Sequence, residues 1–235
     1  MAGTLALVGS GEYLPSMRPL EARLLEGRPS KYVQIATAAV PDGEERLGYW
    51  HELGATQAAS LGVECIIATA RTTADANDPE LAHRVRGAGL IYLSGGHPGF
   101  LAETLRGSLL WEAIVTEWKN GASLAGCSAG AMAMTSWVPS LRHPFEGGVV
   151  GLGLLPHLRV IPHFDAFYQR MPSIVDRFLH GKDPRVQLVG IDEETAIVGG
   201  PESWEVAGLG GAWILSDSRQ RLSNTETLLT PSFTS

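Results

Sequence analysis

The sequence predicts an α/β fold in which helices cover both faces of a mostly parallel sheet, with a short antiparallel extension at one edge. Short apolar runs, typical of fully buried strands, alternate with helical patterns through the first half of the chain. Later strand-like runs follow one another closely, with glycine-rich turns between them. The 28 glycines show no triplet repeat and often flank the strand-like runs, which indicates many tight turns.

The first half is expected to hold five strands and four helices. The strands are Thr4–Val8, Tyr32–Ala36, Glu64–Ala68, Leu90–Leu93 and Ser123–Ala125. The helices are Met17–Glu26, Gly43–Leu61, Pro79–Gly87 and Phe100–Lys119, the last with Gly107 as the point where it would break. Asp78 and Pro79 give the third helix an N-cap and a proline in its first turn.

The second half continues the sheet and then changes character. Two buried strands, Leu158–Ile161 and Val186–Ile191, are expected in the same parallel sheet, with a helix over Phe167–His180 between them. Three short strands, expected to form the antiparallel extension, are Thr195–Val198, Trp204–Ala207 and Ala212–Leu215. Residues 217–235 are polar and are expected to form a loosely held tail, which leaves a single domain over residues 1–216.

Composition narrows the class of protein. With 18 basic and 25 acidic residues the formal charge is −7, which argues against nucleic acid or an anionic membrane as partner. The N-terminal apolar run is short and lacks a basic region before it, and no stretch approaches the ~20 apolar residues of a membrane helix. Cys65 and Cys127 are too few for a disulfide framework or a four-thiolate zinc site. We expect a cytoplasmic protein.

Residues 123–134, SLAGCSAGAMAM, contain the most informative motif. A short apolar strand runs into Gly126–Gly130, and alanine- and methionine-rich residues that favour helix follow. This is the G-x-S-x-G arrangement of a nucleophile elbow, whose glycines permit a sharp turn that exposes the serine. At the start of the following helix, the N–H of Ala129 can stabilise an oxyanion. The motif predicts Ser128 as a nucleophile, and a purely structural turn is the competing interpretation.

A second glycine-rich turn, Ser94–Gly99, also follows a buried strand and opens a helix. Because Gly96 has no side chain to block an approaching substrate, its backbone N–H is the expected second oxyanion donor. Without a nucleophile nearby, the segment would be interpreted as an ordinary structural turn.

A nucleophilic serine needs a base, and His163 is the expected one. It follows Val160–Pro162 at the carboxyl end of an expected strand, where the functional groups of parallel sheets gather. His51 and His83 fall within helical patterns, and His157 lies at the opposite end of the same strand.

A third group must orient the histidine, and several carboxylates are available. The strand that ends at Ile191 is followed by Asp192, Glu193 and Glu194, again at a carboxyl end. Asp165 competes with them, although we expect it to cap the helix that follows. The residues alone leave this choice open.

Five motifs occur together in an order and spacing that resemble a known family. They are YLSGGHPGFLAETL, GCSAGAMAM, GLGLLP, PHF and GIDEETAIV, and the similarity extends over about residues 4–215. The chain resembles the serine peptidase family that contains dipeptidase E (α-aspartyl dipeptidase) and cyanophycinase. That family has a fold similar to class I glutamine amidotransferases, so the resemblance implies the same fold here.

The resemblance implies a serine peptidase that hydrolyses dipeptides or short peptides. The family's nucleophile matches Ser128, and its general base matches His163. Its oxyanion donors match the backbone of Gly96 and Ala129. It further implies a small peptide substrate, no metal and no cofactor, and it makes a homodimer the expected assembly.

The third catalytic member differs between branches of the family. The dipeptidase E branch uses an Asp shortly after the elbow, and residues 129–162 contain none. The cyanophycinase-like branch uses a Glu in an I-D-E-x-T-A context, which matches Glu193, so the expected triad is Ser128, His163 and Glu193. After the two glycines the family often has an acidic or amide pair, and this chain has His97 and Pro98. The resemblance therefore leaves the substrate open.

Three other interpretations compete with the serine peptidase. Chemistry at Cys127 is disfavoured because the glycine frame flanks Ser128, and we expect Cys127 to pack beneath the elbow. An ordinary α/β-hydrolase needs an acid and then a histidine after the serine, but the last histidine, His180, lies in an expected helix. A small-molecule binding or sensor protein on the same scaffold is the third interpretation.

Overall fold

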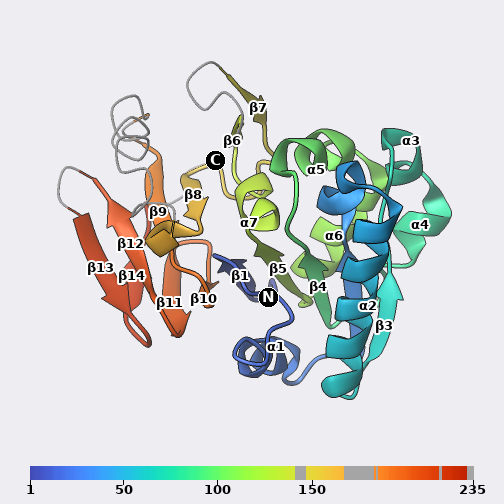
Figure 1. The fold of residues 1–235 in the computed structure, drawn as a ribbon, viewed down its shortest axis with the longest axis horizontal. Helices are drawn as coiled ribbons and strands as arrows, with labels where there is room; N and C mark the ends of the chain where they lie inside the picture. Colours follow the sequence, from blue (N-terminus) through green and yellow to red (C-terminus); the bar gives the residue numbers. More distant parts are fainter. Residues whose placement is uncertain (141–146, 167–182, 184, 217–218, 232–235) are drawn as a thin grey trace.

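The computed structural model describes residues 1–140, 147–166, 183, 185–216 and 219–231. In these residues the chain forms an eight-stranded sheet, a four-stranded sheet and a two-stranded hairpin, with helices packed around the larger sheet (Figure 1). The helix expected over Phe167–His180 lies outside the described residues.

The large sheet has the strand order β14-β11-β10-β1-β5-β4-β2-β3. Its strands are β1 (Leu5–Val8), β2 (Lys31–Ile35), β3 (Glu64–Ile67), β4 (Leu90–Leu93), β5 (Ser123–Cys127), β10 (Thr195–Gly199), β11 (Ser203–Gly208) and β14 (Thr227–Leu229). From β1 to β3 all neighbours are parallel, and beyond β1 they are antiparallel. The predicted fold class is confirmed, but the antiparallel extension consists of β10, β11 and β14, and the expected third strand, Ala212–Leu215, belongs to the second sheet instead.

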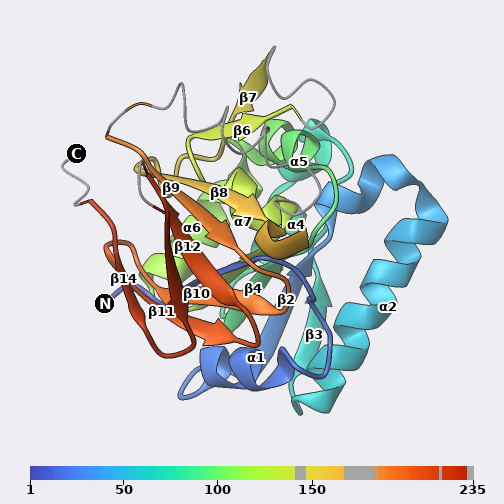
Figure 2. The same cartoon turned by 60° about the vertical axis from the view of Figure 1, so that its left-hand side comes forward.

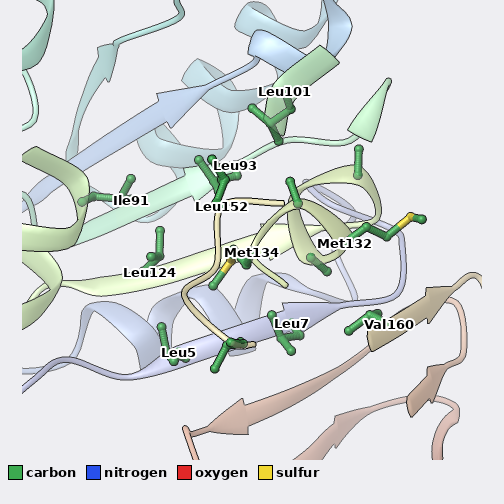
Figure 3. Packing of buried hydrophobic residues seen from close by; sticks show 14 of the residues in the cluster. Leu5, Leu7, Ile91, Leu93, Leu101, Leu124, Met132, Met134, Leu152 and Val160 are labelled. Carbon is green, nitrogen blue, oxygen red and sulfur yellow. The ribbon is translucent and has the colours of Figure 1, made fainter. Parts of the chain in front are cut away.

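Helices cover both faces of this sheet because the side chains of its strands alternate between two apolar clusters. On one face Tyr92 and Cys127 pack with residues of α1 (Arg18–Leu25) and α2 (Glu44–Ser60). On the other face Leu93 and Leu124 pack among later helices, as Figure 3 shows. These helices are α3 (Thr73–Ala76), α4 (Pro79–His83), α5 (Pro98–Leu105), α6 (Leu109–Lys119) and α7 (Ala129–Ala133).

The helix expected over Phe100–Lys119 is divided into α5 and α6, as Gly107 predicted. Gly107 has a φ of 69°, and Ser108 caps α6 by accepting a hydrogen bond from the Trp111 N–H at 3.1 Å. A 3₁₀ helix, η1 (Thr37–Asp42), precedes α2 and was not predicted. Within the described part of the chain, no helix has the length and apolar character needed to cross a membrane.

The second sheet corrects one sequence-based expectation. Its order is β13-β12-β9-β8, with β8 (Leu158–Pro162), β9 (Gln187–Ile191), β12 (Gly211–Leu215) and β13 (Arg219–Ser223). The strands β8 and β9 pair in parallel as expected, but neither joins the central sheet, because β9 pairs with β12 on its other side and β8 lies at the edge. An apolar run indicates that a strand is buried, but it does not identify the neighbouring strand. The pairing therefore could not be predicted from the sequence. Figure 2 brings this sheet forward, beside the central one.

Residues 219–231 also differ from the expected loose tail. They contain β13, which joins the second sheet, and β14, which forms an edge of the large one. Leu222 and Leu228 are buried, so each strand contributes one apolar side chain to the core. One apolar residue in β13 and two in β14 form too weak a pattern to predict a strand.

The remaining hairpin consists of β6 (Trp137–Pro139) and β7 (Gly148–Val150), which pair antiparallel. It lies beyond α7 and beside α5 in Figure 1. The segment from Thr135 to Leu155 returns the chain from the elbow helix to β8, and an isolated parallel bridge joins these two residues.

Candidate active site

The elbow at Ser128 has the strained backbone that the motif predicts. Ser128 follows β5 and precedes α7 with φ 46° and ψ −102°, a conformation that residues other than glycine rarely adopt. The flanking glycines are needed for close packing, because a Cβ on Gly126 would lie 2.6 Å from the Gly130 carbonyl carbon. A Cβ on Gly130 would lie 2.3 Å from the Leu93 carbonyl oxygen. The serine side chain is thereby held above the end of the sheet.

His163 contacts the Ser128 hydroxyl. It follows the last residue of β8, and its Nε2 lies 2.8 Å from Ser128 Oγ. The strand β8 belongs to the second sheet and packs beside α7, so the histidine reaches the serine from a different sheet. The side chain is 42% exposed, which leaves it open to solvent and to a ligand.

Glu193 lies on the other side of the imidazole. Its Oε1 is 3.2 Å from His163 Nδ1, and its side chain is 48% exposed. The turn that carries it follows β9, the parallel neighbour of β8, so the carboxyl ends of two adjacent strands present the histidine and the glutamate together. This placement is the topological reason why the two residues meet.

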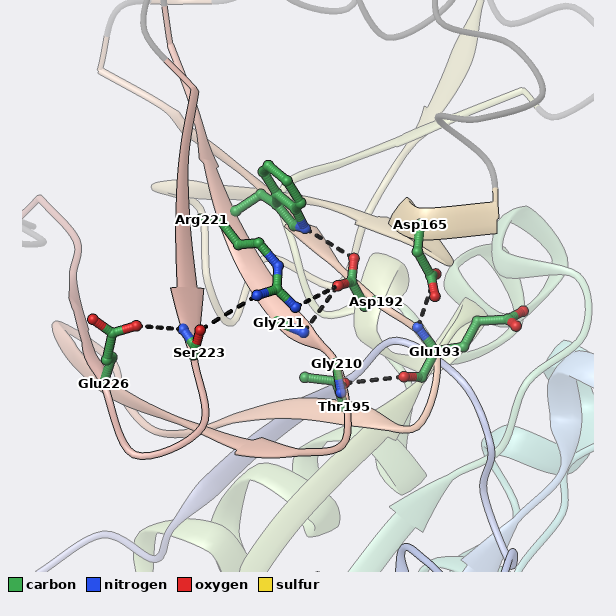
Figure 4. Close-up of polar contacts among 10 residues, drawn as sticks. Asp165, Asp192, Glu193, Thr195, Gly210, Gly211, Arg221, Ser223 and Glu226 are labelled. Atoms are coloured by element: carbon green, nitrogen blue, oxygen red, sulfur yellow. Dashed lines mark hydrogen bonds and ion pairs between the residues drawn. The ribbon is translucent and has the colours of Figure 1, made fainter.

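The Glu193 turn is held rigidly by hydrogen bonds to its neighbours (Figure 4). Asp192, 4% exposed, accepts hydrogen bonds from the Gly211 N–H and from Trp213 Nε1, each at 2.9 Å. Thr195 donates its hydroxyl to the Glu193 carbonyl at 3.0 Å and accepts from the Gly210 N–H. Buried polar groups with satisfied partners hold the backbone from which the Glu193 side chain extends.

The other candidate acids have different partners. Asp165 accepts a hydrogen bond from the Glu193 backbone N–H at 3.1 Å, so it anchors the turn, while the residues that it was expected to cap lie outside the described part of the chain. Glu194 turns away and accepts the Ser16 hydroxyl at 2.5 Å. Of the three carboxylates, Glu193 is the one in hydrogen-bonding distance of His163.

The two expected oxyanion donors flank Ser128. Ala129 is the first residue of α7, and Gly96 is exposed in the loop between β4 and α5. Neither N–H donates a hydrogen bond to another group within the described parts of the chain. A Cβ on Gly95, next to Gly96, would lie 3.6 Å from Ser128 Cβ, so this loop runs directly beside the serine. The sequence-predicted residues are therefore brought together.

Cys127 has the buried position that was expected. It is fully inaccessible, and its thiol donates to Glu12 Oε2 at 2.6 Å. Burial, and secondarily the negative charge of Glu12, raise the pKa of the Cys127 thiol well above its usual value. The thiol therefore stays protonated near neutral pH and is a poor nucleophile.

Glu12 is the residue of this region that the sequence analysis missed. It is 9% exposed, and its Oε1 accepts the Gly95 N–H at 2.8 Å. It follows β1, which neighbours β5 in the large sheet. The available signal was its position two residues after Gly9–Ser10, just past the end of a predicted strand, where functional groups gather.

Two other described histidines have partners away from Ser128. His97 Nε2 pairs with Asp42 Oδ1 at 2.7 Å, and His157 Nε2 lies 2.9 Å from the Pro201 carbonyl. In the residues that the structure describes, no three His, Cys, Asp or Glu side chains are grouped as a metal site would require. The expectation that no metal or cofactor takes part stays a prediction.

A serine and a histidine in contact at the end of an α/β sheet are typical of serine hydrolases. Comparison with known proteins narrows this class. The model of Peptidase family S51 matches residues 5–205, and the chain belongs to that family. A search of curated proteins gave no match.

Solved structures agree with this family. A crystal structure of a peptidase from an acI-B1 Actinobacterium is 40% identical, with a TM-score of 0.89 and coverage of 97% of both chains. A protein from Listeria monocytogenes EGD-e, provisionally assigned as a peptidase E, is 21% identical with a TM-score of 0.61. The match covers 89% of this chain and all of that one, and it shows likeness of fold. The protein is a serine-type peptidase, a hydrolase.

Proposed function

We propose that this protein hydrolyses dipeptides or short peptides through a Ser128–His163–Glu193 triad, in the manner of the dipeptidase E and cyanophycinase family. One observation carries the proposal: a continuous chain of contacts from Ser128 Oγ through the imidazole to Glu193 Oε1, at 2.8 and 3.2 Å. These are the contacts that a nucleophile, its general base and an orienting acid require.

The reaction is acyl transfer. Ser128 Oγ attacks the peptide carbonyl while His163 Nε2 takes its proton, and the imidazolium then gives that proton to the leaving amine. Glu193 accepts from His163 Nδ1, which fixes the tautomer that leaves Nε2 free to act as a base. Water then attacks the acyl-enzyme with His163 again acting as the base, which releases the acid and restores Ser128.

The backbone N–H groups of Gly96 and Ala129 stabilise the charge on the tetrahedral intermediate. Both flank the serine and are without a partner among the described residues, so they can donate to a carbonyl oxygen as it becomes negative. Donors fixed in advance need no reorganisation when the charge develops. The strained φ of Ser128 supports its proposed role as the nucleophile, since backbone strain of this kind concentrates at active sites.

The substrate is a small peptide. The side chains of His163 and Glu193 are nearly half exposed, which favours a site that admits a peptide from solvent. His97 and Pro98, which follow the glycine pair, distinguish this loop from the acidic or amide pair of many relatives. A panel of peptides would identify the position of cleavage. It would distinguish hydrolysis of Asp-X dipeptides, cleavage of a β-aspartyl-arginine bond and removal of a C-terminal residue. A cytoplasmic location and a homodimer belong to the same proposal.

Labelling with a fluorophosphonate tests the nucleophile without knowledge of the substrate. The wild type and Cys127→Ala are expected to be phosphonylated at Ser128, with the site located by mass spectrometry of the digested protein. Ser128→Ala is expected to take up no label, because the hydroxyl that His163 activates has been removed. Label that persists in Ser128→Ala and disappears in Cys127→Ala would instead assign the chemistry to the cysteine.

A further inference from the structure

We propose that Glu12 is a positioning residue that holds the oxyanion loop, Ser94–His97, against the Ser128 elbow. The inference rests on the proposed function in one respect, namely that Gly96 in this loop donates to the oxyanion. Glu12 does not contact the reacting atoms. Its effect on catalysis is expected to pass entirely through the backbone of its neighbours.

The Glu12 carboxylate joins two segments that come from different strands. Oε1 accepts the Gly95 N–H from the loop after β4, and Oε2 accepts the Cys127 thiol from the last residue of β5. The donor distances are 2.8 and 2.6 Å, and all three residues are buried. Since the nucleophile is the next residue after Cys127, this one side chain sets the distance between the oxyanion loop and the elbow.

The contact with Gly95 restrains the peptide that precedes the Gly96 donor. On the other side, the His97 N–H donates to the Ala38 carbonyl at 2.7 Å. The Gly95–Gly96 peptide, which carries the Gly96 N–H, is thus bounded by two peptides whose orientation is fixed. Removing the Glu12 acceptor frees the peptide that carries the Gly95 N–H. The Gly96 N–H is then held less precisely in the direction of the oxyanion.

The same segment, Gly9–Ser16, also contacts the other parts of the site. The Tyr13 hydroxyl lies 2.8 Å from Ser94 Oγ, both of them buried. Ser16 donates to Glu194, the residue after the expected acid. The loop after β1 therefore touches the oxyanion loop, the elbow and the Glu193 turn. Glu12 is its one member whose side chain bridges two of these parts.

The test measures how fast a fluorophosphonate phosphonylates Ser128, because that reaction also places an oxygen in the oxyanion site. Glu12→Leu, which has no acceptor, is expected to lower the second-order rate constant about 10- to 100-fold. Glu12→Gln keeps an oxygen for the Gly95 N–H and can donate its amide to the sulfur of Cys127, so it is expected to stay within about 3-fold of wild type.

Glu21→Leu is the matched control. It removes a second buried carboxylate, one that accepts from the Tyr32 hydroxyl and, within the described residues, makes no hydrogen bond to the oxyanion loop. Its labelling rate is expected to stay within about 3-fold of wild type, because loss of a buried charge alone does not misplace the loop. Circular dichroism melts of all variants identify any that are unfolded at the labelling temperature.

Three results would overturn the inference: Glu12→Leu labels as fast as wild type, Glu12→Gln is as slow as Glu12→Leu, or Glu21→Leu is equally slow.

If Glu12→Leu fails to fold, NMR of ¹⁵N-labelled wild type and Glu12→Gln decides. The Gly95 amide is expected to exchange slowly with solvent and to shift in Glu12→Gln, and a rapidly exchanging Gly95 amide rejects the contact. If the wild type takes no label at Ser128, the proposed function fails, while the NMR result still tests the contact.

Discussion

At the scale of single residues, the site depends on which of several similar groups reaches His163. Asp165, Glu193 and Glu194 lie close together, yet one binds a backbone N–H, one approaches the imidazole and one accepts from Ser16. Their chemistry is nearly the same, so their positions decide which of them contacts His163. A carboxylate at 3.2 Å from Nδ1 can fix the tautomer, and one bound elsewhere cannot.

This assignment predicts the effect of isosteric amides. Glu193→Gln is expected to lower kcat by about 100-fold or more, because the amide no longer favours the tautomer in which Nε2 is the base. Glu194→Gln is the matched control and is expected to stay near wild type, since its amide oxygen still accepts from Ser16. Kinetics on whichever peptide the panel identifies would check both. A larger loss in Glu194→Gln would transfer the acid role to that residue.

At the scale of elements, the loop between β4 and α5 is shaped by one glycine. Gly96 has a φ of 137°, and a Cβ there would lie 2.4 Å from the Ala38 carbonyl oxygen in η1. The loop is therefore wedged between η1 and the elbow, with no space for a side chain. The proposed donor and the tight turn depend on the same residue.

Gly96→Ala is accordingly expected to destabilise the fold by more than about 1 kcal/mol and to slow fluorophosphonate labelling. Gly99→Ala is the matched control three residues later, in the first turn of α5. There the nearest atom to an added Cβ is Val149 Cγ2 at 3.7 Å, an ordinary contact, so stability should be kept or raised by up to about 1 kcal/mol. Thermal unfolding and fluorophosphonate labelling rates measure the effect of each variant. Equal stability and equal labelling rates in the two variants would contradict the lack of space at Gly96.

At the scale of the whole molecule, a buried polar cluster lies between the large sheet and α1. Glu21 is 1% exposed and accepts the Tyr32 hydroxyl at 3.0 Å. Burial raises the pKa of Glu21 to about 7. Tyr13 and Tyr92, from the same cluster, also have a pKa well above the usual value because they are buried. The cluster links a titrating carboxylate to the stability of the fold.

The sign of this linkage follows from the raised pKa. Between about pH 4.5 and 7 the folded state holds a Glu21 proton that the unfolded state has lost, so the contribution to stability is full below that window and is lost as the pH rises through it. The loss amounts to about 3 kcal/mol at most. The free energy of unfolding of Glu21→Gln, taken relative to wild type, should therefore be more favourable at pH 8 than at pH 4.5. Urea unfolding at the two pH values would measure this difference. A difference that does not change with pH would contradict the raised pKa.

Much of the site was readable because its signals are local. The G-x-S-x-G turn at Ser128 and the glycine loop at Gly96 each occupy a few consecutive residues whose backbone needs are visible in the sequence. His163 and the 192–194 turn were readable as chemistry at strand ends. The pairing of β8 and β9 in a second sheet was not, because a buried apolar run is compatible with any neighbour that covers it.

By itself, then, the sequence determined the fold class and the elbow at Ser128, and it named His163 and a short choice of acids as candidates for the site. Only the tertiary structure decided that Glu193 is the acid in contact with His163, and that Asp165 anchors its backbone. It also decided that Glu12, more than a hundred residues before Ser128 in the chain, bridges the oxyanion loop and the elbow. The physical reason is that hydrogen bonds between distant segments depend on strand order, which side-chain periodicity does not encode.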